Sequence, residues 1–405
     1  MDEFPADPAS LGPRRHALTI VIPVYNGGDD LGRCLRGLGT STRTDYELIV
    51  VDDGSTDASA SLAASFGARV LRRDRPGGPA LARNDGAHVA SAPIVFFLDA
   101  DVVVHPDTLA RAIARFDADP GLAALFGSYD DTPADPGLVS RFRNLLHHYV
   151  HQSGEFVDDT RPARTFWTGC GAIRRSSFLG VGGFDPRLYR RPAIEDIELG
   201  YRLTRAKQKI VLARDVLATH LKRWTLANVV RTDIVCRGVP WLLLMKRERI
   251  PETDLNVKSS QKLSVALAVL AIMLVPTSFW IPGAAAVAAG CVGLNAWLNR
   301  DFYRFLARRG GWGFALRALP LHYVYFVCCA LSVVIAEAIW HLGLGPREAA
   351  KAQDGATERG EAAGATMRRP HAAKARRPAA PWTRNRESRS SDPIIDEARS
   401  RRPSR

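Results

Sequence analysis

Two carboxylates end an apolar run in the segment 94–101, whose sequence is Ile-Val-Phe-Phe-Leu-Asp-Ala-Asp. Asp99 and Asp101 offer hard oxygen ligands one residue apart. Such ligands suit Mg²⁺ or Mn²⁺, ions that proteins often share with substrate phosphates. The same two residues could equally be ordinary aspartates that cap a following helix. The sequence around Asp99 and Asp101 must therefore show whether they form a metal site or a helix cap.

The first half of the chain alternates between apolar, β-branched runs and stretches with helical spacing. Such continuous runs are typical of strands buried on both faces, as in a parallel sheet. Strands that alternate with helices of about ten to fifteen residues indicate an α/β fold with right-handed crossovers. The predicted strands are 18–23, 46–51, 68–71, 94–98 and 122–129, and helices are predicted after Gly77-Gly78, from Pro106 and over 138–149.

Polar residues follow three of these strands, in the segments 23–28, 52–57 and 99–101. Because parallel strands end at one edge of a sheet, these residues should meet there and form a pocket. In the first segment, Asp29 or Asp30 could cap the helix that follows. Neither a Gly-x-Gly-x-x-Gly sequence after the first strand nor a Gly-x-x-x-x-Gly-Lys-Ser/Thr sequence is present, which argues against a Rossmann dinucleotide site and a P-loop.

Three histidines, His147, His148 and His151, lie close together at the end of the predicted helix 138–149. They could form part of a metal cluster. No acidic residue has suitable spacing to complete such a site. We therefore expect solvated histidines, or histidines at the edge of the core.

Seven motifs follow one another along the first half of the chain. They are Ile-Val-Ile-Pro23-Val-Tyr25-Asn26, Val-Val-Asp52-Asp53-Gly-Ser-Thr-Asp, Ala82-Arg83-Asn84-x-Gly86, Leu-Asp99-Ala-Asp101, Gly169-Cys-Gly-Ala-Ile-Arg174, Gly182-Gly183-Phe184-Asp185 and Glu195-Asp196-Ile-Glu-Leu-Gly-Tyr-Arg202. In these motifs and their order, the chain resembles the family-2 inverting glycosyltransferases over roughly residues 17–240. The resemblance implies a GT-A-like, Rossmann-type, mostly parallel sheet flanked by helices. It also implies a nucleotide-diphosphosugar, usually a UDP-sugar, as the donor.

The resemblance assigns roles on the donor side of the pocket. It implies that Pro23, Tyr25 and Asn26 lie against the nucleotide and that Asp53 accepts a hydrogen bond from the base. Arg83 would lie near the base or the diphosphate. Asp99 would contact the ribose or the metal, and Asp101 would bind the Mg²⁺ or Mn²⁺ that bridges the two phosphates.

On the acceptor side, the resemblance implies that Asp196 is the general base and that Glu195 helps to position it. His220, in Thr219-His220-Leu-Lys-Arg223-Trp224, lies where some relatives supply a metal or diphosphate contact. This element is similar to the Gln-x-x-Arg-Trp sequence of processive polysaccharide synthases, but histidine replaces the glutamine. A processive polymerase is therefore not supported.

These residue types fit sugar transfer with inversion, which is a direct displacement at the anomeric carbon. A carboxylate takes the proton of the incoming hydroxyl, and a cation absorbs charge on the departing diphosphate. General-base help typically contributes about 10²–10⁴-fold. Two adjacent carboxylates are also common at a helix start, where the dipole favours them, but the accompanying motifs favour the general base.

Three apolar segments follow, over 262–280, 284–298 and 318–342. Nineteen helical residues at ~1.5 Å each reach about 28 Å, close to the hydrocarbon thickness of a bilayer. Basic residues before the first segment and between the second and third should be cytoplasmic. Three spans would place the basic tail outside, whereas a re-entrant second segment would keep it inside; we favour three. Buried helices of a soluble domain are the alternative.

The predicted organisation has five parts. They are a flexible N-terminus at 1–16, a GT-A catalytic domain at 17–240, an interfacial connector at 241–261, a membrane region at 262–342 and a disordered basic tail at 346–405. No apolar core segment lies in the first seventeen residues, which argues against a cleaved signal peptide. The segment 224–241 could guide a lipid-borne acceptor to Asp196, or be a plain helical connector.

The net charge of +13 is concentrated in the tail and around the apolar segments. This distribution suits contact with membrane lipids better than a nucleic-acid groove, so no nucleic-acid partner is expected. The six cysteines form no Cys-x-x-Cys pair, and neither a zinc site nor a disulfide framework is indicated. We expect a multi-pass protein of a bacterial inner or plasma membrane, with a cytoplasmic catalytic domain.

Two functions follow from these features. The first is a membrane-anchored inverting transferase that uses a divalent metal to move a sugar onto a hydroxyl or phosphate of a lipid-linked or cell-envelope glycan acceptor. The second is a transferase-like membrane protein that has lost turnover and serves in assembly or binding. The complete set of carboxylates favours the first.

Overall fold

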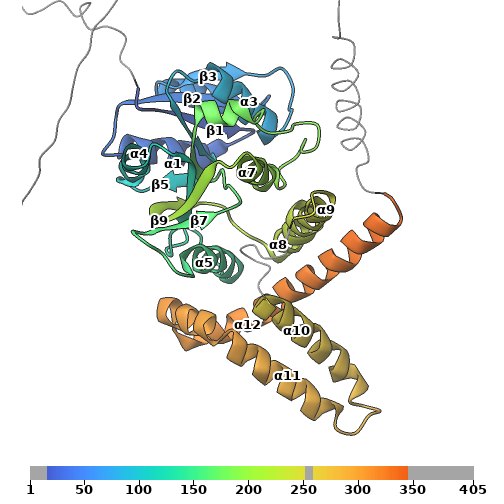
Figure 1. Cartoon of the computed structure of the whole chain (residues 1–405). Helices are drawn as coiled ribbons and strands as arrows, with labels where there is room; N and C mark the ends of the chain where they lie inside the picture. Colours follow the sequence, from blue (N-terminus) through green and yellow to red (C-terminus); the bar gives the residue numbers. More distant parts are fainter. Residues whose placement is uncertain (1–15, 251–258, 345–405) are drawn as a thin grey trace, which may run out of the picture. The chain divides into compact units, whose positions relative to one another are not determined.

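A computed structural model describes residues 16–250 and 259–344. Within these ranges the chain forms a mixed nine-stranded sheet with helices on both faces (Figure 1). The expected N-terminal segment 1–16, apart from its last residue, lies outside the described residues. So do residues 251–258 of the expected connector and the tail 346–405.

The sheet has the strand order β3-β2-β1-β4-β8-β6-β9-β5, and β7 pairs with β9. Four pairs of neighbouring strands are parallel: β1–β2, β2–β3, β1–β4 and β6–β9. The strands are β1 (Leu18–Val24), β2 (Tyr46–Asp52), β3 (Arg69–Arg72), β4 (Ile94–Leu98), β5 (Val102–Val104), β6 (Leu122–Tyr129), β7 (Thr160–Ala163), β8 (Cys170–Arg174) and β9 (Lys209–His220).

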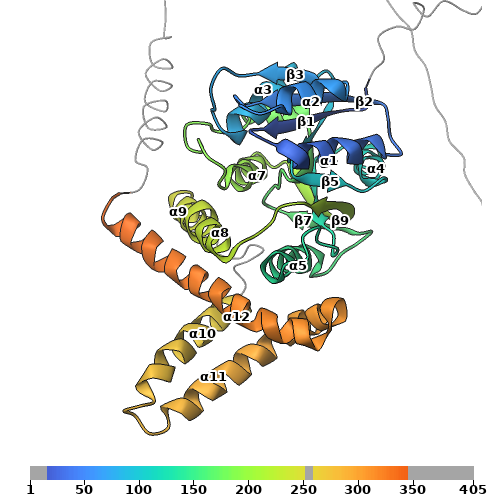
Figure 2. The same cartoon turned by 180° about the vertical axis from the view of Figure 1, so that it is seen from behind.

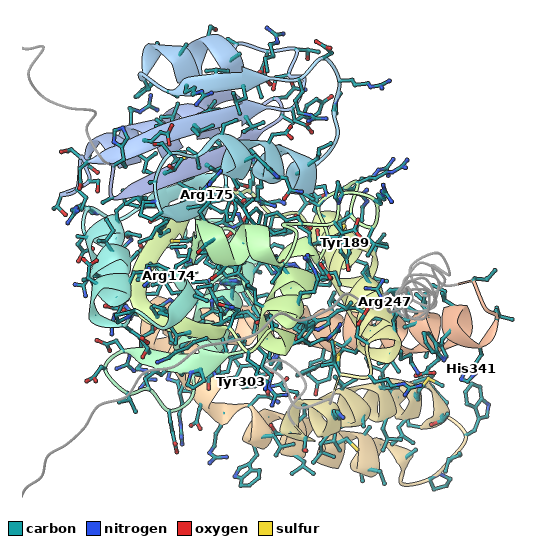
Figure 3. All side chains as sticks on the ribbon, turned by 45° about the horizontal axis from the view of Figure 1, so that its top comes forward. Arg174, Arg175, Tyr189, Arg247, Tyr303 and His341 are labelled. Atoms are coloured by element: carbon teal, nitrogen blue, oxygen red, sulfur yellow. The ribbon has the colours of Figure 1, made fainter. Side chains whose placement is uncertain are left out.

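The prediction of a mostly parallel sheet is confirmed for the N-terminal strands. Strand β8 is inserted antiparallel between β4 and β6, and β5 and β7 each pair antiparallel with β9. Arg174 at the end of β8 donates to the carbonyl of Leu122 at 2.8 Å, and Arg175 donates to the carbonyl of Ala87 at 2.9 Å. Figure 3 labels both arginines, which fasten this strand end to β6 and to a neighbouring helix.

Alternating side chains of the central strands enter two separate cores. In β4, Phe96 packs with Leu31 and Leu109 on one face, whereas Phe97 packs with Phe178 and Leu199 on the other. All five residues of β4 are buried. A strand between two helical layers has no polar face, which explains why its sequence is apolar throughout.

Seven α-helices lie between and after the strands of the sheet, in agreement with the predicted alternation of strands and helices. They are α1 (Gly28–Gly39), α2 (Ser59–Ser65), α3 (Pro79–Val89), α4 (Thr108–Ala118), α5 (Leu138–Gln152), α6 (Arg175–Gly180) and α7 (Glu195–Arg205). Helix α4 begins at Thr108 rather than Pro106, since residues 105–108 form a turn.

The expected cap of α1 by Asp29 or Asp30 is wrong. Both aspartates lie inside the first turn, and no side chain of the helix caps it. Instead, the amides of Gly27 and Gly28 donate to Ser59 Oγ at 2.9 Å and to Asp57 Oδ2 at 3.1 Å. Residues that follow β2 thus accept hydrogen bonds from the free amides at the start of α1, and these bonds join the polar segments after β1 and β2.

A helical segment follows β9, beginning with α8 (Leu226–Arg231), a π-helix η2 (Thr232–Gly238) and α9 (Val239–Arg247). The apolar helices α10 (Ser259–Thr277), α11 (Ala284–Leu298) and α12 (Arg300–His341) come next. Helix α10 starts three residues before the predicted apolar segment 262–280, and α11 has the same bounds as the predicted segment 284–298. The third prediction, 318–342, corresponds to the last part of α12, which is broken at Gly311 with φ 76°.

Helices α10 and α11 form an antiparallel pair joined by a turn (Figure 2). Two helices, α10 and α12, are long and apolar enough to cross a membrane, by length and composition. Helix α12 also packs against α5, where Phe142 and Leu145 contact Phe302 and Leu306.

Candidate functional site

The loops after β1 and β2 interlock at the edge where the sequence placed the pocket. Asn26 has a positive φ of 51° and accepts a hydrogen bond from the amide of Thr56 at 2.8 Å. Its own amide donates to Ser55 Oγ at 2.9 Å. With the two loops joined in this way, Tyr25 is 55% exposed beside the half-buried Pro23. Its exposed aromatic ring offers a surface on which another flat ring could stack.

Asp53 is buried and holds the next loop in place. Its carboxylate accepts from the amides of Gly77 and Gly78 at 2.9 and 2.8 Å and pairs with Arg73 at 3.0 Å. Gly78 has φ 91°, and a Cβ there would lie 2.3 Å from the carbonyl oxygen of Arg190. Asp53 therefore fixes the position of the loop that contains Gly77 and Gly78.

Arg83 joins the two carboxylate pairs that the sequence singled out. Its side chain is 5% exposed and donates to Asp99 Oδ1 at 2.6 Å and to Glu195 Oε1 at 2.9 Å. Burial opposes its charge, but Asp99 and Glu195 raise the pKa of Arg83 above its ordinary value. One permanently charged group thus neutralises one carboxylate from each pair.

Asp101 and His220 lie opposite each other at the ends of β4–β5 and β9. The Nε2 atom of His220 is 3.5 Å from Asp101 Oδ2, and its Nδ1 atom is 2.9 Å from Asn144 Oδ1. The imidazole stacks on Tyr129 with ring centroids 4.3 Å apart. Burial would raise the pKa of Asp101, but His220 and Lys222 hold it below its ordinary value.

Asp196 lies at the first turn of α7, next to Glu195. Its Oδ2 accepts from the amide of Thr168 at 3.2 Å, and its Oδ1 accepts from the amide of Ile197 at 2.8 Å. Burial and the neighbouring charge of Glu195 raise the pKa of Asp196 to about 6. A carboxylate with that pKa is a competent general base near neutral pH.

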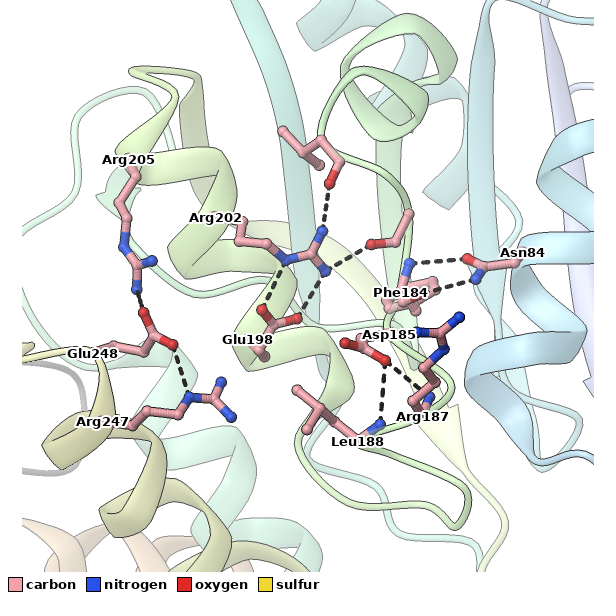
Figure 4. Close-up of polar contacts among 12 residues, drawn as sticks. Asn84, Phe184, Asp185, Arg187, Leu188, Glu198, Arg202, Arg205, Arg247 and Glu248 are labelled. Atoms are coloured by element: carbon pink, nitrogen blue, oxygen red, sulfur yellow. Dashed lines mark hydrogen bonds and ion pairs between the residues drawn. The ribbon is translucent and has the colours of Figure 1, made fainter. Parts of the chain in front are cut away.

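The start of α7 is held by contacts that also explain two of the motifs (Figure 4). Arg202 binds Glu198 through two bonds of 2.7 Å and donates to the carbonyls of Val181 and Gly183 at 2.6 Å. Asn84 bonds the amide of Phe184 at 2.9 Å and its carbonyl at 2.8 Å. The motifs at 182–185 and 195–202 therefore position α7, whose first turn carries Glu195 and Asp196.

The chemistry of the donor set fits a divalent cation only in part. Within 16–250 and 259–344, no group of three or more His, Cys, Asp or Glu side chains is arranged to hold a metal ion. Asp101 and His220 offer two donors, and Asp99 has one oxygen that Arg83 does not occupy. Mg²⁺ is commonly held by one or two carboxylates together with substrate phosphates. Such a cation would need the donor's diphosphate to complete its ligands.

Two of the three histidines of α5, His148 and His151, are buried, and His147 is partly buried, so none of them is a solvated side chain. His148 and His151 bond the backbone carbonyls of Tyr129 and Gly127 at 2.8 and 3.1 Å. His147 and His151 contact the ring of Trp167. Burial lowers the pKa of His151 to about 3, so this side chain is neutral.

The sequence did not reveal two polar residues that orient the site. Thr168 holds Asp196, and its place directly before the Gly169-Cys-Gly motif was the available signal. Asn144 holds His220, and no pattern in the sequence singled it out, because the two are joined only by the fold.

Comparisons with known proteins agree with this geometry. Residues 19–181 match the family model described as Glycosyl transferase family 2. A validoxylamine A glucosyltransferase from Streptomyces hygroscopicus subsp. jinggangensis is 33% identical over 215 residues, which is 46% of this chain and 51% of that protein. A pre-mycofactocin glycosyltransferase from Mycobacterium tuberculosis is 30% identical over 226 residues, covering 54% of this chain and 45% of that protein. The chain thus spans about half the length of these curated relatives.

Among solved structures, a mannosyltransferase from Pyrobaculum calidifontis in complex with GDP-Man and Mn²⁺ is similar to this chain. The TM-score is 0.52 at 20% identity, with coverage of 75% of this chain and 87% of that one. The likeness shows that the two share a GT-A-like fold.

Proposed function

Because residues 19–181 form a glycosyl transferase family 2 domain, we propose that this chain moves a sugar from a nucleotide-diphosphosugar to an acceptor at a membrane. The observation that carries the proposal is the constellation around Arg83. This residue joins Asp99, on the donor side, to Glu195, beside a carboxylate whose pKa is raised to about 6. The transfer inverts the anomeric carbon.

The donor lies along the strand ends. The nucleotide stacks against Tyr25 next to Pro23 and Asn26, and the loop that Asp53 holds borders the base. Arg83 and Asp99 lie beside the ribose and the diphosphate. A UDP-sugar is the donor we expect from the family resemblance.

A divalent cation fits at Asp101 and His220, with Asp99 nearby. When bound there, Mg²⁺ or Mn²⁺ would neutralise charge on the departing diphosphate. The bond between His220 Nδ1 and Asn144 supports this assignment, since histidines that bind metals usually donate their other ring nitrogen to a neighbouring acceptor.

The acceptor's hydroxyl loses its proton to Asp196. Thr168 and Ile197 orient this carboxylate through hydrogen bonds, and Glu195 remains paired with Arg83. The charge of Glu195 raises the pKa of Asp196, while the carboxylate of Glu195 is itself bonded to Arg83. General-base catalysis of this kind contributes about 10²–10⁴-fold.

The helices α10–α12 anchor the enzyme in a membrane. Apolar side chains in these helices and in the turn between α10 and α11 are largely exposed, including Met273 at 63% in α10, and Phe279 at 85% and Trp280 at 79% in the turn. A soluble core helix would bury such residues, whereas lipid covers them without any protein partner. Basic residues of α12, including Arg304 and Arg308, favour a cytoplasmic catalytic domain. The acceptor is accordingly lipid-linked or part of the cell envelope.

The test combines a donor panel with two variants of the full-length protein. Purified membranes are given UDP-sugars, GDP-sugars and Mn²⁺, and products are identified by mass spectrometry. Both Asp101→Ala and Asp196→Ala should abolish transfer, but nucleotide binding should survive the second change far better than the first. A folded wild-type protein that neither transfers nor hydrolyses any donor would favour a non-catalytic assembly role.

A further inference from the structure

The part of α12 that follows the break at Gly311 is long and apolar enough to cross a membrane. It also contacts the rest of the chain at several places. The sheet and the helices from α1 to α9 are here called the α/β domain. Helix α12 packs against α5, η2 and α9, which are three elements of this domain (Figures 1 and 2). The places of these contacts along α12 bear on the side of the membrane that each end of the helix reaches.

The first contact lies near the start of this part of α12. Phe314 belongs to one apolar cluster with Phe142 of α5, and the guanidinium of Arg141 lies 4.4 Å from the centroid of the Phe314 ring. Helix α5 is in turn bound to the sheet, since His148 bonds the carbonyl of Tyr129 in β6 at 2.8 Å. The start of the helix is therefore fixed to the α/β domain.

The last contact lies near the end of α12. Glu337 pairs with Lys246 of α9, whose Nζ atom is 2.9 Å from the carboxylate. Helix α9 belongs firmly to the α/β domain. Leu244 is buried in its core, and Trp241 Nε1 donates to Tyr201 Oη of α7 at 3.0 Å. The end of the helix is thus fixed to the same domain as its start.

A third contact lies between these two. Gly238, at the end of η2, packs so closely on α12 that a Cβ there would lie 2.2 Å from Ser332 Oγ. Val230 and Ile234 also line one groove with Leu331 of α12. The middle of α12 therefore follows the surface of the α/β domain instead of leaving it.

The distance between the first and last contacts is larger than the thickness of the membrane core. From Phe314 to Glu337 an α-helix is ~35 Å long at ~1.5 Å per residue, whereas the hydrocarbon core is about 30 Å thick. A helix that crossed the membrane would carry these two residues to opposite surfaces, so the α/β domain would have to reach both. Ion pairs of this domain, such as that of Arg205 with Glu248, would then lie in hydrocarbon, where charges are costly (Figure 4).

The face of α12 that turns away from the α/β domain is apolar. Trp312 is 64% exposed, Leu316 is 67% exposed and Val334 is 64% exposed, whereas Phe326 and Ala336 on the other face are buried. Before the break, three exposed arginines follow one another at intervals of four residues and share one side of the helix: Arg300, Arg304 and Arg308. An apolar face beside such a basic row fits the surface of a membrane with anionic headgroups.

The pair α10–α11 returns to the side from which it starts. Asn299, directly before α12, donates through Nδ2 to Ser264 Oγ near the start of α10 at 3.0 Å. The exposed Phe279 and Trp280 lie in the turn at the other end of the pair. Helix α12 therefore begins on the side of the membrane where α10 begins.

We propose that α12 lies in the plane of the cytoplasmic leaflet, with one face on the α/β domain and the other in lipid. The pair α10–α11 is then the part that enters the bilayer core. This inference rests on the proposed function, which places the protein in a membrane, and it differs from the three spans favoured on the sequence. Leu344, which follows α12, lies on the same side of the membrane as the α/β domain.

The test determines on which side of the membrane each residue lies. Two variants of the full-length protein carry a new cysteine, Leu344→Cys after α12 and Val157→Cys in the α/β domain, at positions that are 72% and 75% exposed. The six native cysteines are buried or partly buried, so the wild type gives the background. A maleimide that does not cross membranes is added to bacterial spheroplasts and to inverted vesicles. We expect both variants to be labelled in inverted vesicles and neither in spheroplasts.

A second measurement tests the contact at the end of α12 within the membrane. The double variant Lys246→Cys/Glu337→Cys is treated with a short bifunctional maleimide, and the cross-linked peptides are identified by mass spectrometry. We expect this pair to be joined, because the two side chains are in contact. The control pair, Val157→Cys/Glu337→Cys, should remain separate.

Labelling of Leu344→Cys in spheroplasts, with Val157→Cys labelled in inverted vesicles, would overturn the inference, because α12 would then cross the membrane. Absence of the cross-link in folded, membrane-bound protein would overturn it as well. Labelling of both single variants in spheroplasts alone would contradict the cytoplasmic leaflet. Sugar transfer by the wild type together with any of these results would leave the proposed activity standing. Conversely, a failure of all donors would remove the activity without changing the labelling pattern.

Discussion

We call residues 17–240 the catalytic half, because we propose that sugar transfer takes place there. Its strands and the helices α10–α12 are comparably apolar in sequence, but their surroundings differ. Phe96 and Phe97 in β4 are almost completely buried between two layers of helices, whereas Phe279 and Trp280 after α10 are about four-fifths exposed. An apolar run therefore predicts that its side chains are shielded from water, but not whether protein or lipid shields them. In the first region other parts of the chain cover it, and in the second we propose that lipid does.

The two regions also treat charge differently. In the catalytic half, buried carboxylates are grouped at strand ends and bound by arginine or backbone amides, as Glu195 is by Arg83 and Ala193. In the apolar helices the buried polar groups are neutral and satisfy one another, as Asn295 and Asn299 do with Ser264. The first arrangement keeps charges available for chemistry, and the second only joins helices.

The largest expected effect is on the buried charges of the catalytic half. Asp196→Asn should lower the transfer rate by about 10²–10⁴-fold, because the amide cannot accept the acceptor's proton. Since the raised pKa means that ionised Asp196 is disfavoured in the fold, the variant should gain stability over the wild type as the pH rises through about 6. Rate assays and thermal unfolding at pH 5 and pH 8 measure both. Full activity in the variant would remove the base assignment.

Arg83→Met should cost about 3–5 kcal/mol in the free energy of unfolding, because it leaves Glu195 buried without its cation. The matched control is Arg111→Met, which also removes an arginine that contacts two carboxylates, Asp107 and Asp215. Arg111 is 45% exposed, so its loss should cost less than about 1 kcal/mol. Denaturant titration of the two variants makes the comparison, and equal losses would contradict it.

The contrast between protein cover and lipid cover can be tested with two exposed valines. Val334 on α12 is 64% exposed and Val157 in the catalytic half is 75% exposed. Val334→Asp should disfavour membrane insertion by about 2.5–3.5 kcal/mol, whereas Val157→Asp should change nothing. The measurement is the fraction of protein that alkaline carbonate fails to extract from membranes. Unchanged retention of the Val334 variant would contradict a lipid-facing position.

The smallest expected effect concerns the pH profile. Transfer should fall about tenfold for each pH unit below about 6 and level off above it, since Asp196 must be deprotonated. Thr168→Val removes the hydroxyl that lies 3.4 Å from Asp196 Oδ2 but keeps the amide bond. The midpoint should then move upward by less than about one pH unit, because a hydrogen bond to the charged form has been lost. A downward shift would contradict this role.

Much of the fold followed from the pattern of apolar runs. The prediction for 122–129 coincides with β6, and that for 284–298 coincides with α11. The antiparallel insertion of β8 was not predicted, because a strand buried on both faces has the same sequence pattern in either direction. The break at Gly311 was not predicted, because it lies before the third predicted apolar segment, 318–342.

For the site, strand ends and motifs predicted which residues gather, but not which ones bind each other. The pairing of Arg83 with Glu195 joins positions 112 residues apart, and no local spacing encodes it. The support of Asp53 by Gly77 and Gly78 also depends on how two loops meet.

The bridge made by Arg83 has a consequence for how this sequence can drift over time. Loss of either Asp99 or Glu195 would leave the buried guanidinium with one partner, and loss of Arg83 would leave both carboxylates without a counter-charge. Single replacements at these three positions are therefore each harmful. Among descendants of this protein, we expect positions 83, 99 and 195 to be inherited together or to change together.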